Sequence, residues 1–197
     1  DARDKQLALA AELGLPPETT PAAELFRRKY GMQAGNIVGI GTFNPHSTPP
    51  DLATGLSPDI TPFWMVGGTG AEVEVDTATG HVRIIRLVNI ADLGKPINPK
   101  IVATQLSGAA VMQLGCTMSE RMEYVAGQLT NGSLADYKIP GMRDMPQHME
   151  NDFVDSRQRS GPHGAKGVGE TATFGVSPAI ANAIHDAVGV RLTALPV

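Results

Sequence analysis

The residues best suited to chemistry lie in one short stretch near the end of the chain, residues 164–170, which read Gly-Ala-Lys-Gly-Val-Gly-Glu. The glycines at 164, 167 and 169 allow backbone conformations with positive φ and a close approach to another group. The N–H groups of such a loop can then bind an electron-rich atom. Lys166 adds a cation, and Glu170 adds a carboxylate that could serve as a general acid or base. The pattern predicts a functional loop, although glycine-rich turns before helices are also common as plain connectors.

The spacing of these glycines excludes two common nucleotide-binding motifs. The stretch is not a P-loop, because no Gly-Lys-Ser/Thr follows four residues after a glycine. It is not a Rossmann-type dinucleotide loop either, since that motif needs a preceding strand and an acidic residue about 20 positions further on. The residues alone therefore leave the reaction open.

Composition narrows the class of protein. A chain of 197 residues is long enough for one core, or for two small lobes that share one. With 16 Lys and Arg against 20 Asp and Glu, the net charge is -4, which argues against a general nucleic-acid binder. The single cysteine, Cys116, excludes an internal disulfide and a cysteine-based zinc or iron–sulfur site, and it favours a reducing compartment. No apolar run reaches the roughly 20 residues that span a bilayer, so we expect no membrane span.

Cap and breaker residues predict two helices near the N-terminus, followed by irregular chain. The first helix is expected over residues 4–13 with Gly14 after it, and the second from Thr20-Pro21 to Tyr30. Residues 31–61 are rich in glycine and proline and are expected to form a long loop, with a short strand at residues 36–40. Loops of that length are usually functional or rest on a partner.

The clearest strand signal is a hairpin formed by residues 62–75 and 81–90, joined by a turn at residues 76–80. Acidic residues alternate with apolar ones in its first strand and at the turn, and we assign them to a solvated face rather than to a metal site: Glu72, Glu74 and Asp76. The chain's five histidines show no pairing at metal-ligand spacing, so none is assigned to a metal.

A long helix is expected from Asn98-Pro99 to about Glu120, with Ile101 on its buried face. Small residues cluster in its middle, at 107–110, where a glycine costs about 1 kcal/mol relative to alanine. This predicts that another group approaches closely there. Gln105 lies beside the small residues and could offer its amide to that group.

The C-terminal part is expected to contain an extended piece at residues 137–140 and a last helix over residues 179–188, capped by Ser177-Pro178 and closed by Gly189. Residues 190–195 suit a short final strand. The methionines between residues 118 and 149 are expected to fill irregular core or interface rather than to bind a metal.

Several segments, in this order, resemble the molybdenum hydroxylases, which include xanthine dehydrogenase, aldehyde oxidase, aldehyde oxidoreductase and aerobic carbon monoxide dehydrogenase. They are residues 71–76, 89–99, 105–109, 129–132, 137–140, 144–146 and 167–170. The resemblance is to the C-terminal part of the molybdenum-binding subunit and implies one molybdopterin-binding domain over residues 1–197. The implied fold class is α+β, with a mixed sheet, packed helices and long irregular loops. Residues 112–115 depart from the family, reading Met-Gln-Leu-Gly where many relatives have Gln-Gly-Leu-Gly.

The resemblance also implies roles for particular residues. Glu170 would be the general base of a hydroxylase that adds a water-derived oxygen to an aldehyde or N-heteroaromatic carbon. Gln105 would bind the pterin, as would the backbone of Lys166, Gly167, Val168 and Gly169. No side chain of this chain need ligate molybdenum.

The implied cofactor is molybdenum-molybdopterin, as the cytosine dinucleotide form in bacteria, with 2Fe–2S and FAD groups on partner chains. The implied partners are the remainder of the molybdenum-binding subunit, iron–sulfur and flavin subunits and a small-molecule substrate, and the expected location is the cytoplasm. The family's molybdenum subunit is several times longer than this chain. The alternative is therefore a non-catalytic scaffold subunit, or a truncated piece, that supports a partner molybdenum chain.

Overall fold

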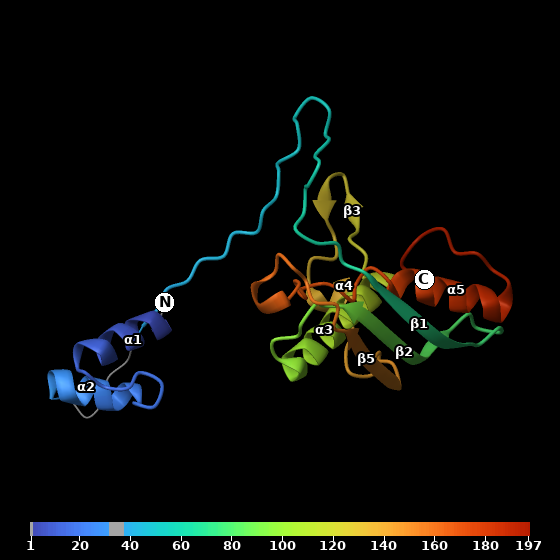
Figure 1. The fold of residues 1–197 in the computed structure, drawn as a ribbon. Coiled ribbons are helices and arrows are strands. Elements are labelled where there is room, and N and C mark those ends of the chain that lie inside the picture. The colour runs from blue at the N-terminus through green and yellow to red at the C-terminus, as the bar shows by residue number, and fades with distance from the viewer. Residues whose placement is uncertain (1, 32–37) are drawn as a thin grey trace. The chain divides into compact units, whose positions relative to one another are not determined.

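The computed structural model describes residues 2–31 and 38–197 and divides the chain into two compact units, Asp1–Asn44 and Pro45–Val197 (Figure 1). The assignment of residues 1–197 to one domain stays a prediction. The two units are described separately below.

The first unit consists of two helices, α1 (Ala2–Glu12) and α2 (Ala22–Tyr30), near the predicted positions. Thr20 does not cap α2, however, because its hydroxyl donates to Pro16 O at 2.7 Å and Pro21 takes the N-cap position. Helix α2 ends at Gly31, whose left-handed backbone (φ 67°) lets its N–H donate to the carbonyl of Arg27. The fully buried residues of the pair are Ala10 and Leu25. Of the strand expected at residues 36–40, positions 36 and 37 lie outside the described residues, and 38–40 form no strand.

The second unit is built on a three-stranded mixed sheet in the order β1 (Gly67–Val75), β2 (Val82–Asp92), β5 (His148–Val154). Strands β1 and β2 form the expected antiparallel hairpin, although β1 begins at Gly67 and not at residue 62. Strand β5 runs parallel to β2. Parallel strands need a long crossover, and here α3 and a turn-rich passage supply it (Figure 1).

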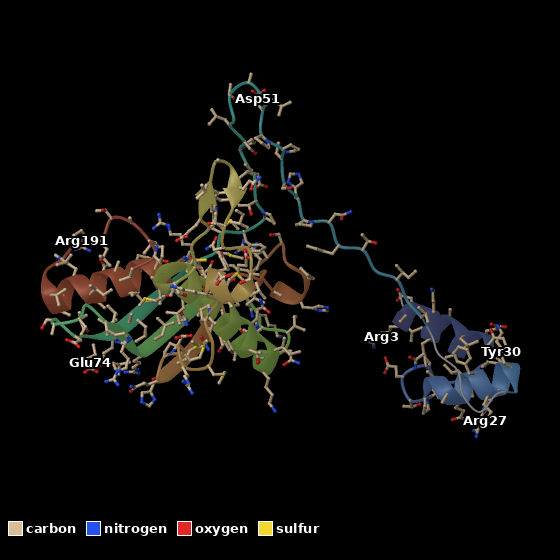
Figure 2. All side chains as sticks on the ribbon, turned by 180° about the vertical axis from the view of Figure 1, so that it is seen from behind. Arg3, Arg27, Tyr30, Asp51, Glu74 and Arg191 are labelled. Atoms are coloured by element: carbon tan, nitrogen blue, oxygen red, sulfur yellow. The ribbon has the colours of Figure 1, made fainter. Side chains whose placement is uncertain are left out.

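A bulge in the hairpin keeps one face of the sheet apolar. Glu72 pairs with Arg86 but the next residue pairs with Ile84, so Ile85 has no partner. The shift in register places both Ile84 and Leu87 in the core, although they are three residues apart. The opposite face is solvated, as expected, and Figure 2 shows Glu74 projecting from it, where it forms an ion pair with Arg83.

Helix α3 (Pro99–Met118) begins as predicted, because the Asn98 side chain accepts a hydrogen bond from the N–H of Ile101 at 3.3 Å. By length and composition α3 is long and apolar enough to cross a bilayer, a property that core helices share. Its buried residues instead belong to the core beside β5 and α5: Val102, Leu106, Ala109, Ala110, Leu114, Gly115 and Thr117. Ile101 is 65% exposed and not buried as expected, because it lies on the opposite side of the helix.

Helix α5 (Val176–Val188) packs mainly on β1 and ends at Gly189 as predicted. It begins at Val176 rather than at 179, because the Ser177 hydroxyl does not cap it. That hydroxyl instead accepts a hydrogen bond from Gln113 at 2.6 Å and lies 2.7 Å from the Thr117 hydroxyl on α3. Gly175 is needed before the helix, since a Cβ there would collide with the Thr69 side chain on β1.

The remaining elements are short: β3 (Tyr124–Val125), β4 (Gln128–Leu129), α4 (Leu134–Tyr137) and a single 3-10 turn, η1 (Pro162–Gly164). The extended piece expected at residues 137–140 is wrong, because Tyr137 ends α4 and Lys138 is left-handed (φ 64°). The strand expected at residues 190–195 does not form. That segment returns along the protein so that the N–H of Val197 donates to Thr117 O at 2.8 Å.

Replacing Leu106 with alanine should lower the free energy of unfolding by about 2–5 kcal/mol, because the side chain is completely buried and its loss leaves a cavity. Ile101→Ala in the same helix is the matched control and should change that free energy by less than about 0.5 kcal/mol. Urea unfolding followed by circular dichroism measures both. Equal effects of the two substitutions would mean that α3 does not face the core as described.

Candidate functional site

The loop at residues 164–170 is held against the end of β2. Gly94 and Ala165 form an isolated antiparallel bridge. On either side of it, Lys95 N donates to Gly164 O at 2.7 Å and Lys166 N donates to Leu93 O at 2.9 Å. Gly94 has φ 58°, and a Cβ there would collide with the Gly164 carbonyl oxygen. Only glycine therefore allows the two segments to lie this close.

The side chain of Lys166 points back to the sheet. Its Nζ lies 2.7 Å from Asp92 Oδ2, and the two side chains are only 9% and 20% exposed. Asp92 Oδ1 also accepts hydrogen bonds from Ser156 Oγ at 2.5 Å and from Gly94 N at 3.0 Å. The ammonium group of Lys166, which the sequence pattern suggested for ligand binding, therefore pairs with Asp92 inside the protein.

The environment of Asp92 sets its acidity. Partial burial raises the pKa of the carboxyl, but the hydrogen bonds from Lys166, Ser156 and Gly94 and the Lys166 charge lower it more. The net result is a pKa of about 2, so Asp92 is ionised and balances the ammonium group of Lys166.

The far end of the loop is fixed by Gln105. Its Nε2 donates to Gly169 O at 2.6 Å, which joins α3 to the loop across 64 residues of sequence. The sequence singled out Gln105 and the loop separately, and the structure brings them together. Within the described residues, the Gln105 amide oxygen accepts no hydrogen bond.

The loop glycines meet the sequence prediction of positive φ and close approach only in part. Only Gly164 has a positive φ, at 83°, so left-handed backbone is not the reason for the other two. A Cβ on Gly167 would come within 3.2 Å of the Phe63 ring, whereas one on Gly169 would meet nothing within 4 Å. Gly108 on α3 is equally open, so the close approach predicted there is not made by the described part of this chain.

The surface between these anchors carries unused donors and one carboxylate. Across residues 2–31 and 38–197, no acceptor is hydrogen-bonded to the N–H groups of residues 167–170. The side chain of Glu170 is exposed and forms no ion pair within the same residues. The Glu170 carbonyl is occupied, accepting from Thr173 Oγ1 at 2.8 Å. The arrangement could bind an electron-rich group beside a free base.

Sequence reasoning missed the residues that support the loop. Gln158 Nε2 donates to Pro62 O at 2.7 Å, which places Phe63 against Gly167. The Thr171 hydroxyl lies 3.6 Å from the Met65 sulfur. A single-sequence pattern gives no signal for these contacts, because they join segments about 100 residues apart. In the sequence, Asp92 stood out only as part of residues 89–99, one of the segments that resemble the molybdenum hydroxylases.

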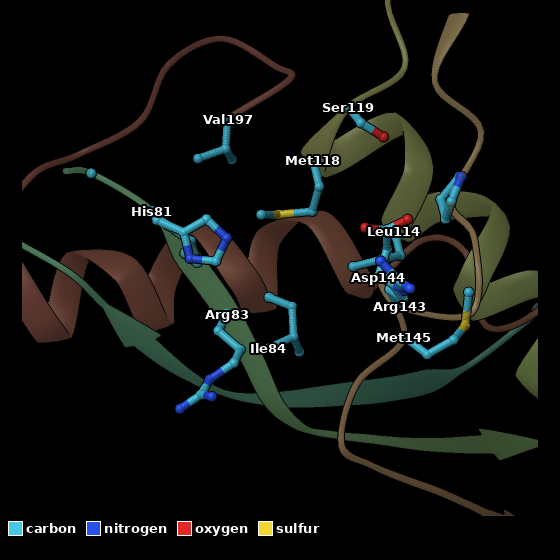
Figure 3. Close-up of a pocket in the computed structure, with 13 residues that line it drawn as sticks. His81, Arg83, Ile84, Leu114, Met118, Ser119, Arg143, Asp144, Met145 and Val197 are labelled. Carbon is cyan, nitrogen blue, oxygen red and sulfur yellow. The ribbon is translucent and has the colours of Figure 1, made fainter. Parts of the chain in front are cut away.

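One of the hollows on this unit is a groove that adjoins the loop. That groove, of about 200 Å³, is lined by Ile97 and Ile101 on one side and by Ala165 and Val168 on the other. A separate hollow of about 410 Å³ lies between the start of β2 and the end of α3, where His81 and Met118 face it (Figure 3). None of the candidate site residues lines this larger hollow. In the described ranges, no three His, Cys, Asp or Glu side chains gather as metal ligands.

A family model for the molybdopterin cofactor-binding domain matches residues 2–146, well over half of the 197-residue chain. The chain belongs to this family. The match ends before the loop at residues 164–170, so it supports the family and not the role of any loop residue.

Curated relatives of this molybdopterin-binding domain have oxidoreductase names. The probable hypoxanthine oxidase XdhD of Escherichia coli K12 is 34% identical over 163 residues, which are 82% of this chain and 16% of that protein. The aldehyde oxidoreductase molybdenum-binding subunit PaoC of the same organism is 36% identical over 132 residues, 66% of this chain and 18% of that subunit. The chain therefore spans about one sixth of the length of the curated relatives it matches.

Solved structures confirm the fold class predicted from the sequence. Aldehyde oxidoreductase from Desulfovibrio gigas gives a TM-score of 0.69 at 32% identity, over 76% of this chain and 16% of that one. Quinoline 2-oxidoreductase from Pseudomonas putida 86 gives a TM-score of 0.59 at 34% identity, over 62% of this chain and 16% of that one. A Cu,Mo-CO dehydrogenase shares the fold at 23% identity, with a TM-score of 0.65 over 95% of this chain and 25% of that one.

Acid should release the stabilisation that Asp92 provides. Because its pKa is about 2 when folded against an ordinary 3.8, this stabilisation is complete above about pH 5 and is lost as the pH falls through about 2. The loss amounts to about 2 kcal/mol of unfolding free energy. Urea unfolding of the wild type and of Asp92→Asn at several pH values measures it.

The difference in unfolding free energy between wild type and Asp92→Asn should shrink by about 2 kcal/mol between about pH 5 and pH 2. Asp186→Asn, at an exposed position on α5, is the control and should show no such narrowing. A constant difference for Asp92→Asn across this range would show that its carboxylate is not specially stabilised.

Proposed function

We propose that this domain forms one wall of the cofactor site of a molybdenum-dependent hydroxylase, which adds a water-derived oxygen to an aldehyde or N-heteroaromatic carbon. The observation that carries the proposal is the exposed carboxylate of Glu170, presented at the end of a loop with unpaired N–H groups. Family membership supports the cofactor class, and the names of the relatives support oxidoreductase chemistry.

The loop fits a molybdopterin cofactor. Gly169 and Gly108 face open space, so a bulky planar group can approach the backbone at both positions. The N–H groups of residues 167–170 and the free amide oxygen of Gln105 supply donors and an acceptor of the kind that a pterin and its sulfur atoms need. When bound, the cofactor would supply the redox centre and a Lewis acid.

The chain's own contribution is to hold a base and to position the cofactor. Gln105 and the backbone of Lys166, Gly167, Val168 and Gly169 would bind the pterin. The Glu170 carboxylate would accept a proton from the water-derived oxygen as that oxygen attacks the substrate carbon. Because its side chain makes no ion pair within the described residues, no internal bond has to break first.

The chain spans about one sixth of the length of the curated relatives it matches. We propose that the remainder of a molybdenum-binding subunit completes the cofactor site, and that partner chains carry the 2Fe–2S and FAD groups. The cytosine dinucleotide form of the cofactor and a cytoplasmic location belong to the same proposal.

Glu170→Gln in the complete enzyme should lower kcat by about 10²–10⁴-fold, because the amide cannot accept the proton. Molybdenum and pterin contents should stay at the wild-type level. Glu72→Gln, which changes an exposed carboxylate on β1, should leave kcat unchanged. Steady-state turnover of benzaldehyde, hypoxanthine and quinoline with a dye acceptor measures kcat. Full turnover by Glu170→Gln would refute the proposed base.

The alternative, a non-catalytic scaffold, makes a different prediction about cofactor content. We expect stoichiometric molybdenum and pterin in the purified assembly that contains this chain, measured by elemental analysis and by fluorescence of the released pterin. We also expect a glycine-to-leucine change at Gly169 to reduce both, since the side chain would fill the open space there. An assembly without molybdenum or pterin would establish the scaffold.

A further inference from the structure

Three separate parts of the fold meet at the carboxylate of Asp92, the last residue of β2. Lys166 comes from the loop, Ser156 from the segment after β5, and Gly94 from the turn after β2, and each donates to this carboxylate at 3.0 Å or less. The resemblance and the family match give Asp92 no role of its own.

Lys166 is held twice, and this fixes the course of the loop. Its main-chain N–H donates to Leu93 O at 2.9 Å while its ammonium group bonds Asp92 at 2.7 Å. Three residues further on, Gly169 is held by Gln105 at 2.6 Å. Only Gly167 and Val168 lie between the two fixed residues, Lys166 and Gly169. The position of Glu170, which follows Gly169 directly, is therefore restricted.

We propose that Asp92 is a positioning residue for Glu170, acting through Lys166; this rests on the proposed function. Its negative charge retains the ammonium group of Lys166, which is only 9% exposed. Without the carboxylate, that ammonium would be buried with no counter-charge among the described residues. A buried unpaired charge is strongly unfavourable, so the lysine would move to solvent and draw the loop with it.

The two main-chain hydrogen bonds that hold the loop against β2 give a readout that does not depend on turnover. The N–H of Lys166 donates to Leu93 O, and the N–H of Lys95 donates to Gly164 O. Both amides exchange with solvent only when the loop leaves β2. Hydrogen–deuterium exchange of these amides therefore reports whether the loop stays in place.

The experiment compares wild type, Asp92→Asn, Ser156→Ala and Asp186→Asn in the assembled holoenzyme. In Asp92→Asn, exchange at Lys95 and Lys166 should accelerate by about tenfold or more. For the substrate that the wild type turns over, kcat should fall by about 10–100-fold with KM unchanged, because the base is misplaced while substrate contacts remain. Asp186→Asn, exposed on α5, should behave as wild type in both measurements.

Ser156→Ala removes one donor and keeps the charge, so its changes in exchange and kcat should both be smaller than those of Asp92→Asn. If Asp92→Asn does not fold, Ser156→Ala decides alone: accelerated exchange with a lower kcat supports the inference. Unchanged exchange in the folded variants overturns it, as does faster exchange with wild-type kcat. If Glu170→Gln shows full turnover while exchange at Lys95 and Lys166 accelerates in Asp92→Asn, the proposed function is refuted. The role of Asp92 in holding the loop against β2 is then still supported.

Discussion

The ion pair between Lys166 and Asp92 is the interaction on which the rest of the site depends. It joins a loop that has little secondary structure to the end of a central strand, in a place where both side chains are mostly buried. Buried charges are favourable only when they are paired and hydrogen-bonded, and Asp92 satisfies this with three donors. Moving the loop away from β2 would separate the pair and leave a mostly buried charge without its partner, so the pair favours the position that the loop occupies.

The topology of the sheet makes that meeting point available. Strand β5 runs parallel to β2, so both strands end at the same edge of the sheet. The chain that follows β5 therefore starts next to Asp92, and it brings Ser156 and then the loop to it within a few residues. An antiparallel β5 would have delivered the same sequence to the opposite edge. The long α3 crossover that permits parallel pairing also carries Gln105 to the far end of the loop.

Local signals in the sequence were enough for the hairpin, the start of α3 and the ends of α2 and α5, because caps and alternation act within a few residues. They failed where a distant contact decides the outcome. Ser177 has the residue type of a cap, but its hydroxyl bonds Gln113 and Thr117 on α3. Gly167 has the residue type of a flexible turn, but its small size leaves room for Phe63, about 100 residues earlier. The residue types drew attention to Glu170 and Gln105, and the resemblance implied one site for both, but only the fold showed the hydrogen bond from Gln105 to Gly169 that joins them.

In the proposed site, Gln105 would serve both the loop and a bound group. A carbonyl oxygen can only accept, so the Gln105 group that faces Gly169 O must be the NH₂. This fixes the orientation of the amide and leaves one N–H and the oxygen, in the same plane, for a group that lies beside Gly169, where the space is open. A ligand that matches this pair must offer a donor next to an acceptor, as a pterin ring edge does. The same hydrogen bond that steadies the loop would thus also select what the proposed site recognises beside it.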